Sequence, residues 1–503
     1  MFILSQRTGR RMAVKKAVAI LLTVLMLVPL FGCGKTAGEG NELWVVTEAT
    51  TWDHMNGQIA AVAEQFEKDN EGVTVRVDIL PLDEQERSVY LQQLRTQILR
   101  GAGPDVYLLP TSPDLTVDAA IGYSRISVDP LFSDVQQAMK NGMFRDIAGL
   151  YDADAELGKE ALKTSVMNAG VVDGKRYVLP LRYDIPVIYA DMETMELEGF
   201  SAEDLQKPVD ELMAQILELD CLQAARGFNL PSVSVFSRWM DYDEQQVSLD
   251  ADTISAFLQS YQAVRALRGE NFYGSKLNVR YYCTRSYPNG MIDFRFNTGS
   301  LSELVDYAPV YQHEGRELMV LPMRSMGGDV VADVTYYGAV GSGCKDMELA
   351  YRFLRQFLLE DSQWERNRPQ SQNAVGEKGR KVSTTNSTQM TGLIEDGWPV
   401  RIEGSLEPLW VMRKRQFYNR RISYGPENNK RIRAVVMAEL EDHWSDILTQ
   451  EPDQVRFGST MNGLFLDMVQ SLNDPQTNKP KNADIPALAE KFWWQLRWHV
   501  AEG

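Results

Sequence analysis

The sequence predicts an α/β fold in which a mainly parallel sheet is covered by helices. Two observations support this prediction. The chain has 503 residues, of which 44% are hydrophobic and 24% charged. That length allows about three domains, or two large lobes, at ~100–200 residues per domain. After residue 42, strand-like and helix-like patterns alternate, as they do in right-handed β-α-β crossovers.

The first elements follow one another as strand, helix, strand, helix and strand. Residues 43–46 are a short apolar run, suited to a strand buried on both faces. Apolar residues at helical spacing predict a helix over 55–66, and strict alternation of apolar and polar residues predicts a strand over 73–79. A second helix around 91–98 and a third strand over 105–109 complete the pattern. In such sheets, ligands bind beyond the carboxyl ends of the strands.

Composition excludes several classes of function. Acidic residues outnumber basic ones by 69 to 52, and the net charge is -17. A general nucleic-acid binder would need a basic face to pair with phosphates, so no nucleic-acid partner is expected. Four His and four Cys in a chain of this length do not provide a Cys/His metal framework, and no metal or cofactor is expected. No Gly-x-Ser-x-Gly motif and no Ser–His or Cys–His pairing is apparent, so the chain is not expected to be an enzyme.

The N-terminal sequence is typical of a targeting segment. Five Lys or Arg residues are followed by an apolar run from 17 to 31, the pattern of a secretory signal peptide over residues 1–32. Leu30-Phe31-Gly32-Cys33 resembles a bacterial lipobox, which predicts lipidation of Cys33 and a flexible tether over 33–42. The alternative is an ordinary signal with an incidental Cys. The expected location is the outer face of the bacterial cytoplasmic membrane, through a lipid anchor.

Several segments in the right order resemble family 1 extracellular solute-binding proteins, the lipoprotein receptors of ABC-type sugar importers. "GVTVRVDIL" and "GAGPDVYLL" are similar to the opening of that family, and "DGKRYVLPLRYDIPVIYAD" is similar to its Tyr-x-x-Pro segment. Later matches are "NGMIDFRFNTGS", in which Asp293 departs from an apolar position, "MVLPMRSMGGD", and the segment over 344–365. The resemblance covers roughly residues 43 to 365 and the final helix. Residues 366–480 match less clearly.

The resemblance implies two α/β lobes of periplasmic-binding-protein type, each with a mainly parallel sheet, and a ligand cleft between them. The N-terminal lobe is expected over 43–145 plus 315–362, and the C-terminal lobe over 146–314 plus 363–503. The implied function is capture of a carbohydrate, expected to be an oligosaccharide, by a monomer whose lobes close on it. The implied partners are ABC permease subunits with a cytoplasmic ATPase. The alternative function is a surface scaffold or signalling lipoprotein that keeps the fold without transport.

Sugar recognition requires flat aromatic rings and a few convergent polar groups. Residues of these kinds stand at predicted strand ends and in loops. The predicted ligand-binding residues are Glu48, Trp52, Asp53, Thr111, Ser112, Arg182, Asp184, Arg238, Trp239, Asp241, Tyr336 and Tyr337. Trp52 could instead pack over a helix start and Asp53 could cap it, and Arg182 could pair with Asp184.

The remaining Trp and Cys residues have simpler interpretations. Five tryptophans lie in apolar periodic segments and are expected to pack in a core or on a helix face: Trp44, Trp364, Trp493, Trp494 and Trp498. Cys221, Cys283 and Cys344 allow at most one disulfide, and the sequence does not determine which. We expect all three to be buried small apolar residues.

Overall fold

The architecture comes from a computed structural model of the chain. It describes residues 41–48, 54–81, 83–111, 114–119, 122–230, 232–236, 239–241, 246–267, 296–301, 318–359, 398–400, 446–447, 449–458, 460–472, 481 and 483–502. The predicted signal peptide and Cys33 lie outside these residues. Within the described ranges, none of the helices combines the length and the apolar character needed to cross a bilayer.

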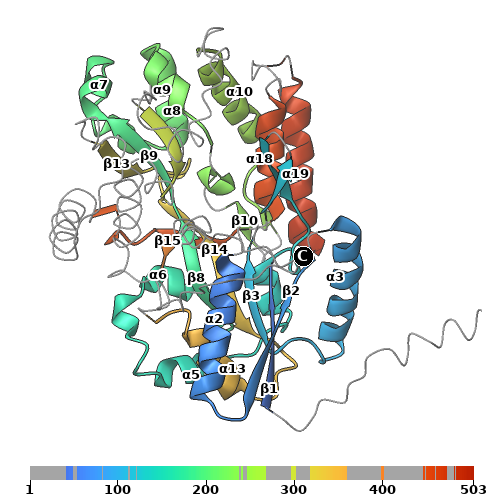
Figure 1. The fold of residues 1–503 in the computed structure, drawn as a ribbon. Helices are drawn as coiled ribbons and strands as arrows, with labels where there is room; N and C mark the ends of the chain where they lie inside the picture. The colour runs from blue at the N-terminus through green and yellow to red at the C-terminus, as the bar shows by residue number, and fades with distance from the viewer. Residues whose placement is uncertain are drawn as a thin grey trace, which may run out of the picture.

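A seven-stranded mixed sheet forms the larger half of the protein (Figure 1). β1 (Asn41–Thr47) lies between β2 (Val73–Ile79) and β3 (Val106–Pro110), and both pairings are parallel. β14 (Val331–Val340) is the longest of these strands and pairs antiparallel with β3 and with β8 (Val178–Asp184). β15 (Trp398–Pro399) extends the sheet beside β8, and β16 (Gln454–Phe457) runs parallel to the beginning of β14.

The two neighbours on one side of β14 meet end to end. β3 pairs with Tyr336–Val340, whereas β16 pairs with Val331–Val334. The carbonyl of Val334 accepts hydrogen bonds from both neighbours, at 2.9 Å from the hydroxyl of Thr111 and at 3.1 Å from the backbone N–H of Gly458. The start of β14 therefore lies just beyond the carboxyl end of β3.

Helices pack around this sheet and bury the first of two hydrophobic cores. They are α2 (His54–Asp69), α3 (Glu84–Leu99), α4 (Val135–Lys140), α5 (Ala148–Ala153), α6 (Thr164–Asn168), α13 (Met347–Arg355) and the short 3₁₀ helix η2 (Lys159–Ala161). α3 begins where Asp83 accepts the backbone N–H groups of Gln85 and Glu86, which satisfies two of the unpaired donors at a helix start.

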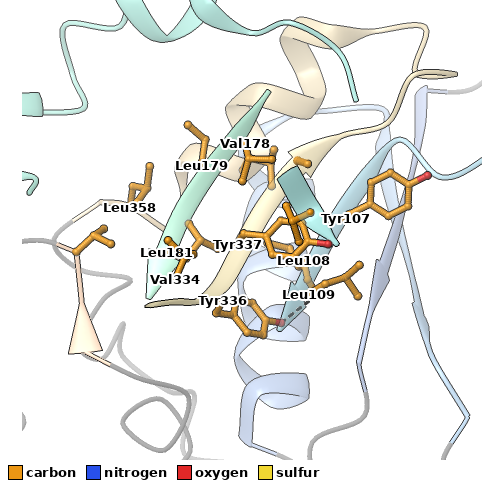
Figure 2. Close-up of a cluster of buried hydrophobic side chains, with 14 of the residues drawn as sticks. Tyr107, Leu108, Leu109, Val178, Leu179, Leu181, Val334, Tyr336, Tyr337 and Leu358 are labelled. Carbon is orange, nitrogen blue, oxygen red and sulfur yellow. Dashed lines mark hydrogen bonds between the residues drawn. The ribbon is translucent and has the colours of Figure 1, made fainter. Parts of the chain in front are cut away.

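The centre of the first core consists of side chains from three adjacent strands. Figure 2 shows Leu108 and Leu109 of β3, Leu179 and Leu181 of β8, and Tyr336 and Tyr337 of β14 gathered there. The tyrosines are fully buried, so their hydroxyls need partners inside the protein. The Tyr336 hydroxyl donates to the carbonyl of Leu108 at 3.0 Å.

A second, three-stranded sheet is entirely antiparallel, with β9 (Pro186–Asp191) between β12 (Phe296–Ser300) and β13 (Leu318–Pro322). β9 follows β8 after the single residue Ile185. Its residues alternate between the cores: Val187 and Tyr189 pack in the first core, whereas Ile188 and Ala190 pack in the second. The second sheet therefore lies between the two cores and contributes one face to each.

The second core is mainly helical and fills the upper part of Figure 1. Its elements are α7 (Met192–Leu197), η3 (Asp204–Gln206), α8 (Val209–Glu218), α9 (Leu222–Gly227), η4 (Val233–Val235), α10 (Ala251–Leu267), α18 (Thr460–Ser471) and α19 (Ile485–Glu502). α9 approaches β12 so closely that a Cβ on Gly227 would stand 1.7 Å from the carbonyl oxygen of Phe296, which explains the glycine there.

Three hairpins complete the described strands: β4 (Asp114–Ala119) with β5 (Gly122–Ser127), β6 (Val171–Val172) with β7 (Lys175–Arg176), and β10 (Met240–Asp241) with β11 (Gln246–Val247). The β6–β7 turn places Asp173 and Gly174 at φ 51° and 73°. Positive φ at both central residues is characteristic of a tight hairpin turn, and Asp-Gly is a preferred pair for it.

The α/β class is confirmed, and so are the first five predicted elements, which appear as β1, α2, β2, α3 and β3. The prediction of a mainly parallel sheet in each lobe is wrong for the second sheet, which is antiparallel. The larger sheet is mixed. β12 and β13 both run opposite to β9, so no pair of neighbours in this sheet has the β-α-β arrangement on which the prediction was based.

Each core is built from segments that lie far apart in the sequence. Residues 147–183, which the prediction placed in the C-terminal lobe, pack in the first core. The physical reason is β8, because its pairing with β14 keeps the preceding helices on the larger sheet. The chain passes from the first core to the second along β9.

The structure shows where two of the cysteines and two of the tryptophans discussed above lie. Cys221 and Cys344 are buried free thiols, and burial raises their pKa to about 11 and about 12. Trp494 and Trp498 are 46% and 59% exposed, so neither is a core residue. The Trp494 ring nevertheless packs on the helix face against the ring of Trp493, with centroids 5.1 Å apart. Trp494 and Trp498 lie on the outer face of α19, whereas Trp493 turns inward and donates to the carbonyl of Leu249 at 2.7 Å. Trp364 and Cys283 lie outside the described residues.

Candidate functional site

A polar cluster lies where the two cores meet, at the beginning of β14. Asp333 is the third residue of that strand, and its carboxylate is almost completely buried. One of its oxygens accepts the hydroxyl of Ser232 at 2.7 Å and that of Ser234 at 2.5 Å. Both serines belong to the turn that forms η4, whose valines pack in the second core. Asp333 therefore joins the seven-stranded sheet to the second core.

Arg456 occupies the position beside Asp333 on β16. Its Nε donates to the second carboxylate oxygen of Asp333 at 2.7 Å. Its guanidinium carbon lies 5.1 Å from the centroid of the Trp239 ring. An arginine held in this way by a carboxylate and an aromatic ring has a fixed orientation. We call Asp333, Arg456, Trp239, Ser232 and Ser234 the junction cluster.

The strand register brings more charge to the junction cluster. Asp184 of β8 lies opposite Asp333, on the side of β14 away from β16. Because cross-strand neighbours project from the same face of a sheet, Asp184, Asp333 and Arg456 share one face. Two carboxylates directly opposite each other repel, and the guanidinium beside them offsets that repulsion. The backbone N–H of Ile185 also donates to Asp184, at 2.9 Å.

Glu48, a predicted ligand contact, is bound by a neighbouring side chain. Arg87 of α3 donates to both of its carboxylate oxygens, at 2.6 and 2.9 Å, and both side chains are only 3% exposed. Arg87 also donates to the carbonyl of Asp129 at 2.7 Å. Burial raises the pKa of Glu48, against the lowering effect of Arg87. In this structure Glu48 therefore fixes the end of β1 to α3.

Three further predicted ligand contacts also bond or pack within the protein: Thr111, Tyr336 and Tyr337. The Thr111 hydroxyl donates to the carbonyl of Val334, as described above. The Tyr336 hydroxyl lies 3.1 Å from the hydroxyl of Thr47, in addition to its bond to Leu108. Tyr337 is enclosed in the first core, where burial raises the pKa of its phenol well above the usual range. These three residues hold β1, β3 and β14 together.

Trp239 was predicted as an open stacking platform, but it is 3% exposed and packs in the second core. Arg182 and Asp184 lie on one face of β8, and Arg182 is buried and donates to the carbonyl of Leu181 at 3.2 Å. Asp241 pairs through its backbone with Gln246. The predicted residues Trp52, Asp53, Ser112 and Arg238 lie outside the described residues.

Several predicted residues thus converge on one edge of the large sheet, beyond the carboxyl ends of β1 and β3. Glu48, Thr111, Asp184 and Tyr336 all lie there. The sequence reasoning missed Arg456, which stands in a stretch that resembles the family less clearly. A signal was available, because Arg456 alternates with Val455 and Phe457 and so predicts a strand with one charged face.

Among the described residues, no group of three or more His, Cys, Asp or Glu side chains is placed to hold a metal ion. The junction cluster offers hydroxyls, one carboxylate, one guanidinium and an indole ring. This chemistry suits hydrogen bonding to a polar solute beside an apolar surface.

Comparison with known proteins gives structural matches only. No family model matches the chain, and no curated protein matches it. Among 548 matching solved chains is a family 1 extracellular solute-binding protein from Alicyclobacillus acidocaldarius, 13% identical with a TM-score of 0.44. The match covers 91% of this chain and 98% of that one.

Two further matches have similar values. An ABC substrate-binding protein from Listeria monocytogenes in complex with cycloalternan is 12% identical with a TM-score of 0.45, covering 92% of this chain and 99% of that one. A periplasmic oligogalacturonide binding protein from Yersinia enterocolitica is 13% identical with a TM-score of 0.44, with the same coverage. Designed esterases also occur among the matches. With TM-scores below 0.5, the matches do not decide what this chain binds.

Proposed function

We propose that the protein is a lipid-anchored extracellular solute-binding protein. It captures a carbohydrate, an oligosaccharide in our proposal, and delivers it to an ABC importer. The observation that carries the proposal is the position of the junction cluster. Hydroxyl, carboxylate, guanidinium and indole groups meet between two hydrophobic cores that are connected through β9. The order of family-like segments in the sequence points to the same function.

The proposed mechanism is a change in the arrangement of the two cores. A solute held by groups from both sides favours the arrangement in which Ser232, Ser234 and Trp239 on one side and β14 and β16 on the other enclose it. Binding can shift such an equilibrium only by its difference in affinity for the two arrangements. The importer would recognise the closed arrangement, and the lipid on Cys33 would keep the monomeric receptor near its permease subunits and their ATPase.

The test is a ligand screen on the detergent-solubilised full chain. A panel of neutral and acidic oligosaccharides is added at up to millimolar concentration, and thermal unfolding is followed. A true ligand with a Kd near ~1 μM stabilises the folded state by about 2.7 kcal/mol at a hundredfold excess over Kd. Stabilisation by a sugar supports the proposal. A folded protein that no sugar stabilises contradicts it and favours the scaffold or signalling role.

A further inference from the structure

Among the described residues, only one of the three guanidinium nitrogens of Arg456 has a hydrogen-bond partner. Its Nε is bound to Asp333, but Nη1 and Nη2 are enclosed and have no hydrogen-bond partner among the described residues. The Trp239 ring faces the guanidinium and does not accept the N–H groups that point outward in its plane. Buried donors without acceptors are costly, and a pair of them on a charged group is especially so.

The Asp333 carboxylate, which accepts the hydrogen bond from Arg456, is itself held in place. Asp333 receives two serine hydroxyls on one oxygen and the guanidinium on the other. This second layer of hydrogen bonds fixes the guanidinium plane before any ligand arrives. The free edge of Arg456 is therefore a preorganised fork of two parallel N–H donors.

Among the described residues of β8, β14 and β16, the charged side chains are two cations and two anions. Arg182 and Asp184 lie two residues apart on β8, on the face that Asp333 and Arg456 share. Two cations and two anions thus occupy neighbouring positions. An anionic solute would leave this buried cluster with an uncompensated negative charge, whereas a neutral solute would keep it balanced.

We propose that Arg456 is a specificity-determining residue that recognises two adjacent hydroxyl groups of a neutral sugar through Nη1 and Nη2. The inference rests on the proposed function and names the solute class for the same site. The sugar oxygens accept hydrogen bonds from these two nitrogens, which have no partner among the described residues. Because both nitrogens are enclosed in this arrangement, the solute reaches them when Trp239 and β16 move apart.

The experiment compares three forms of the full chain by calorimetric titration. The ligands are the neutral sugar that stabilises the protein best, its monodeoxy analogues and trigalacturonate. Arg456→Lys keeps a cation beside Asp333 but removes the fork. Arg355→Lys is the matched control, since Arg355 also pairs with a buried carboxylate, that of Asp154, and the two arginines are 18% and 20% exposed.

Arg456→Lys should weaken binding of the neutral sugar by about 10- to 100-fold, the range for losing hydrogen bonds to a charged group. Arg355→Lys should leave the affinity unchanged. In the unmodified protein, removal of one particular hydroxyl should weaken binding, and in Arg456→Lys the same removal should have little further effect.

Three outcomes are decisive. Equal affinities for Arg456→Lys and the unmodified protein overturn the inference and leave the proposed function standing. Tighter binding of trigalacturonate than of every neutral sugar also overturns it, again without removing the function. Stabilisation by no sugar at all overturns the proposed function and, with it, the inference.

Discussion

Glu48 and Arg456 show how differently two ion-paired residues are treated in this protein, the first with a side chain 3% exposed and the second 18% exposed. The Glu48 carboxylate has a bidentate partner in Arg87, so its hydrogen-bonding capacity is used within the fold. In the part of the chain that the structure describes, Nη1 and Nη2 of Arg456 have no acceptor. A fully paired group serves the fold, whereas a fixed group with unused donors is available to a ligand. Whether a side chain's hydrogen-bonding groups are already paired within the fold therefore distinguishes structural residues from candidate ligand-binding residues better than residue type does.

Trp239 gives the first prediction. Its ring is buried in the second core, so Trp239→Ala should lower the free energy of unfolding of the ligand-free protein by ~3–5 kcal/mol through the cavity it leaves. Trp498→Ala, on the exposed face of α19, is the control and should change it by less than ~0.5 kcal/mol. Urea unfolding measures both. A Trp239→Ala protein as stable as the control would show that the ring is not part of the core.

Sequence reasoning placed several candidate residues at one edge of the sheet, but it did not show which of their side chains are already paired within the fold. Thr111 and Tyr336 were chosen because they follow or form strands, and both lie at the predicted edge. Their hydroxyls, however, bond to carbonyls more than 200 residues away in the sequence. Such pairings depend on the register between distant strands, which a local pattern does not contain.

The segment that leads into β16 depends on α6 for its position. Lys163, just before that helix, is completely buried. Its backbone N–H donates to the carbonyl of Val400 at 2.9 Å, and its Nζ donates to the carbonyl of Gln450 at 2.8 Å. Three stretches far apart in the sequence thus meet at one lysine, close to the strand that carries Arg456.

Lys163 predicts a pH dependence of stability. Burial lowers its pKa to about 8, and the nearby Glu451 only partly opposes this. Below about 8 the folded protein bears the full cost of a buried cation. As the pH rises from about 8 towards the unfolded-state value near ~10.4, folding is relieved of that cost, by up to about 3 kcal/mol. Stability relative to Lys163→Met should therefore rise with pH over this range.

The measurement is urea unfolding at several pH values between 7 and ~10. Lys159→Met, four residues earlier, is the control for the loss of a lysine side chain, because Lys159 is only half-buried. Parallel curves for the unmodified protein and Lys163→Met would show that Lys163 does not titrate in this way.

At the scale of the whole molecule, the α/β class could be predicted, and the path of the chain between the cores could not. Residues 43–109 alternate clearly because each strand is followed by its own helix, and these elements were predicted correctly. The family-like segment that ends at residue 191 includes the apolar run from 178 to 191. In the structure it is two strands in two sheets, β8 and β9, separated by Ile185. A hydrophobic pattern in the sequence indicates which residues are buried, but it does not indicate in which core they pack.

The shared sheet predicts that the two cores unfold together. Val187 packs in the first core and its neighbour Ile188 in the second, on opposite faces of β9. Loss of either core would expose one face of the same three strands, so neither half remains folded alone. Calorimetry should show one transition, and Val187→Ala and Ile188→Ala should each lower its midpoint, because each leaves a cavity in a buried face. Two transitions, with Val187→Ala shifting one and Ile188→Ala shifting the other, would show that the cores are independent despite the strand they share.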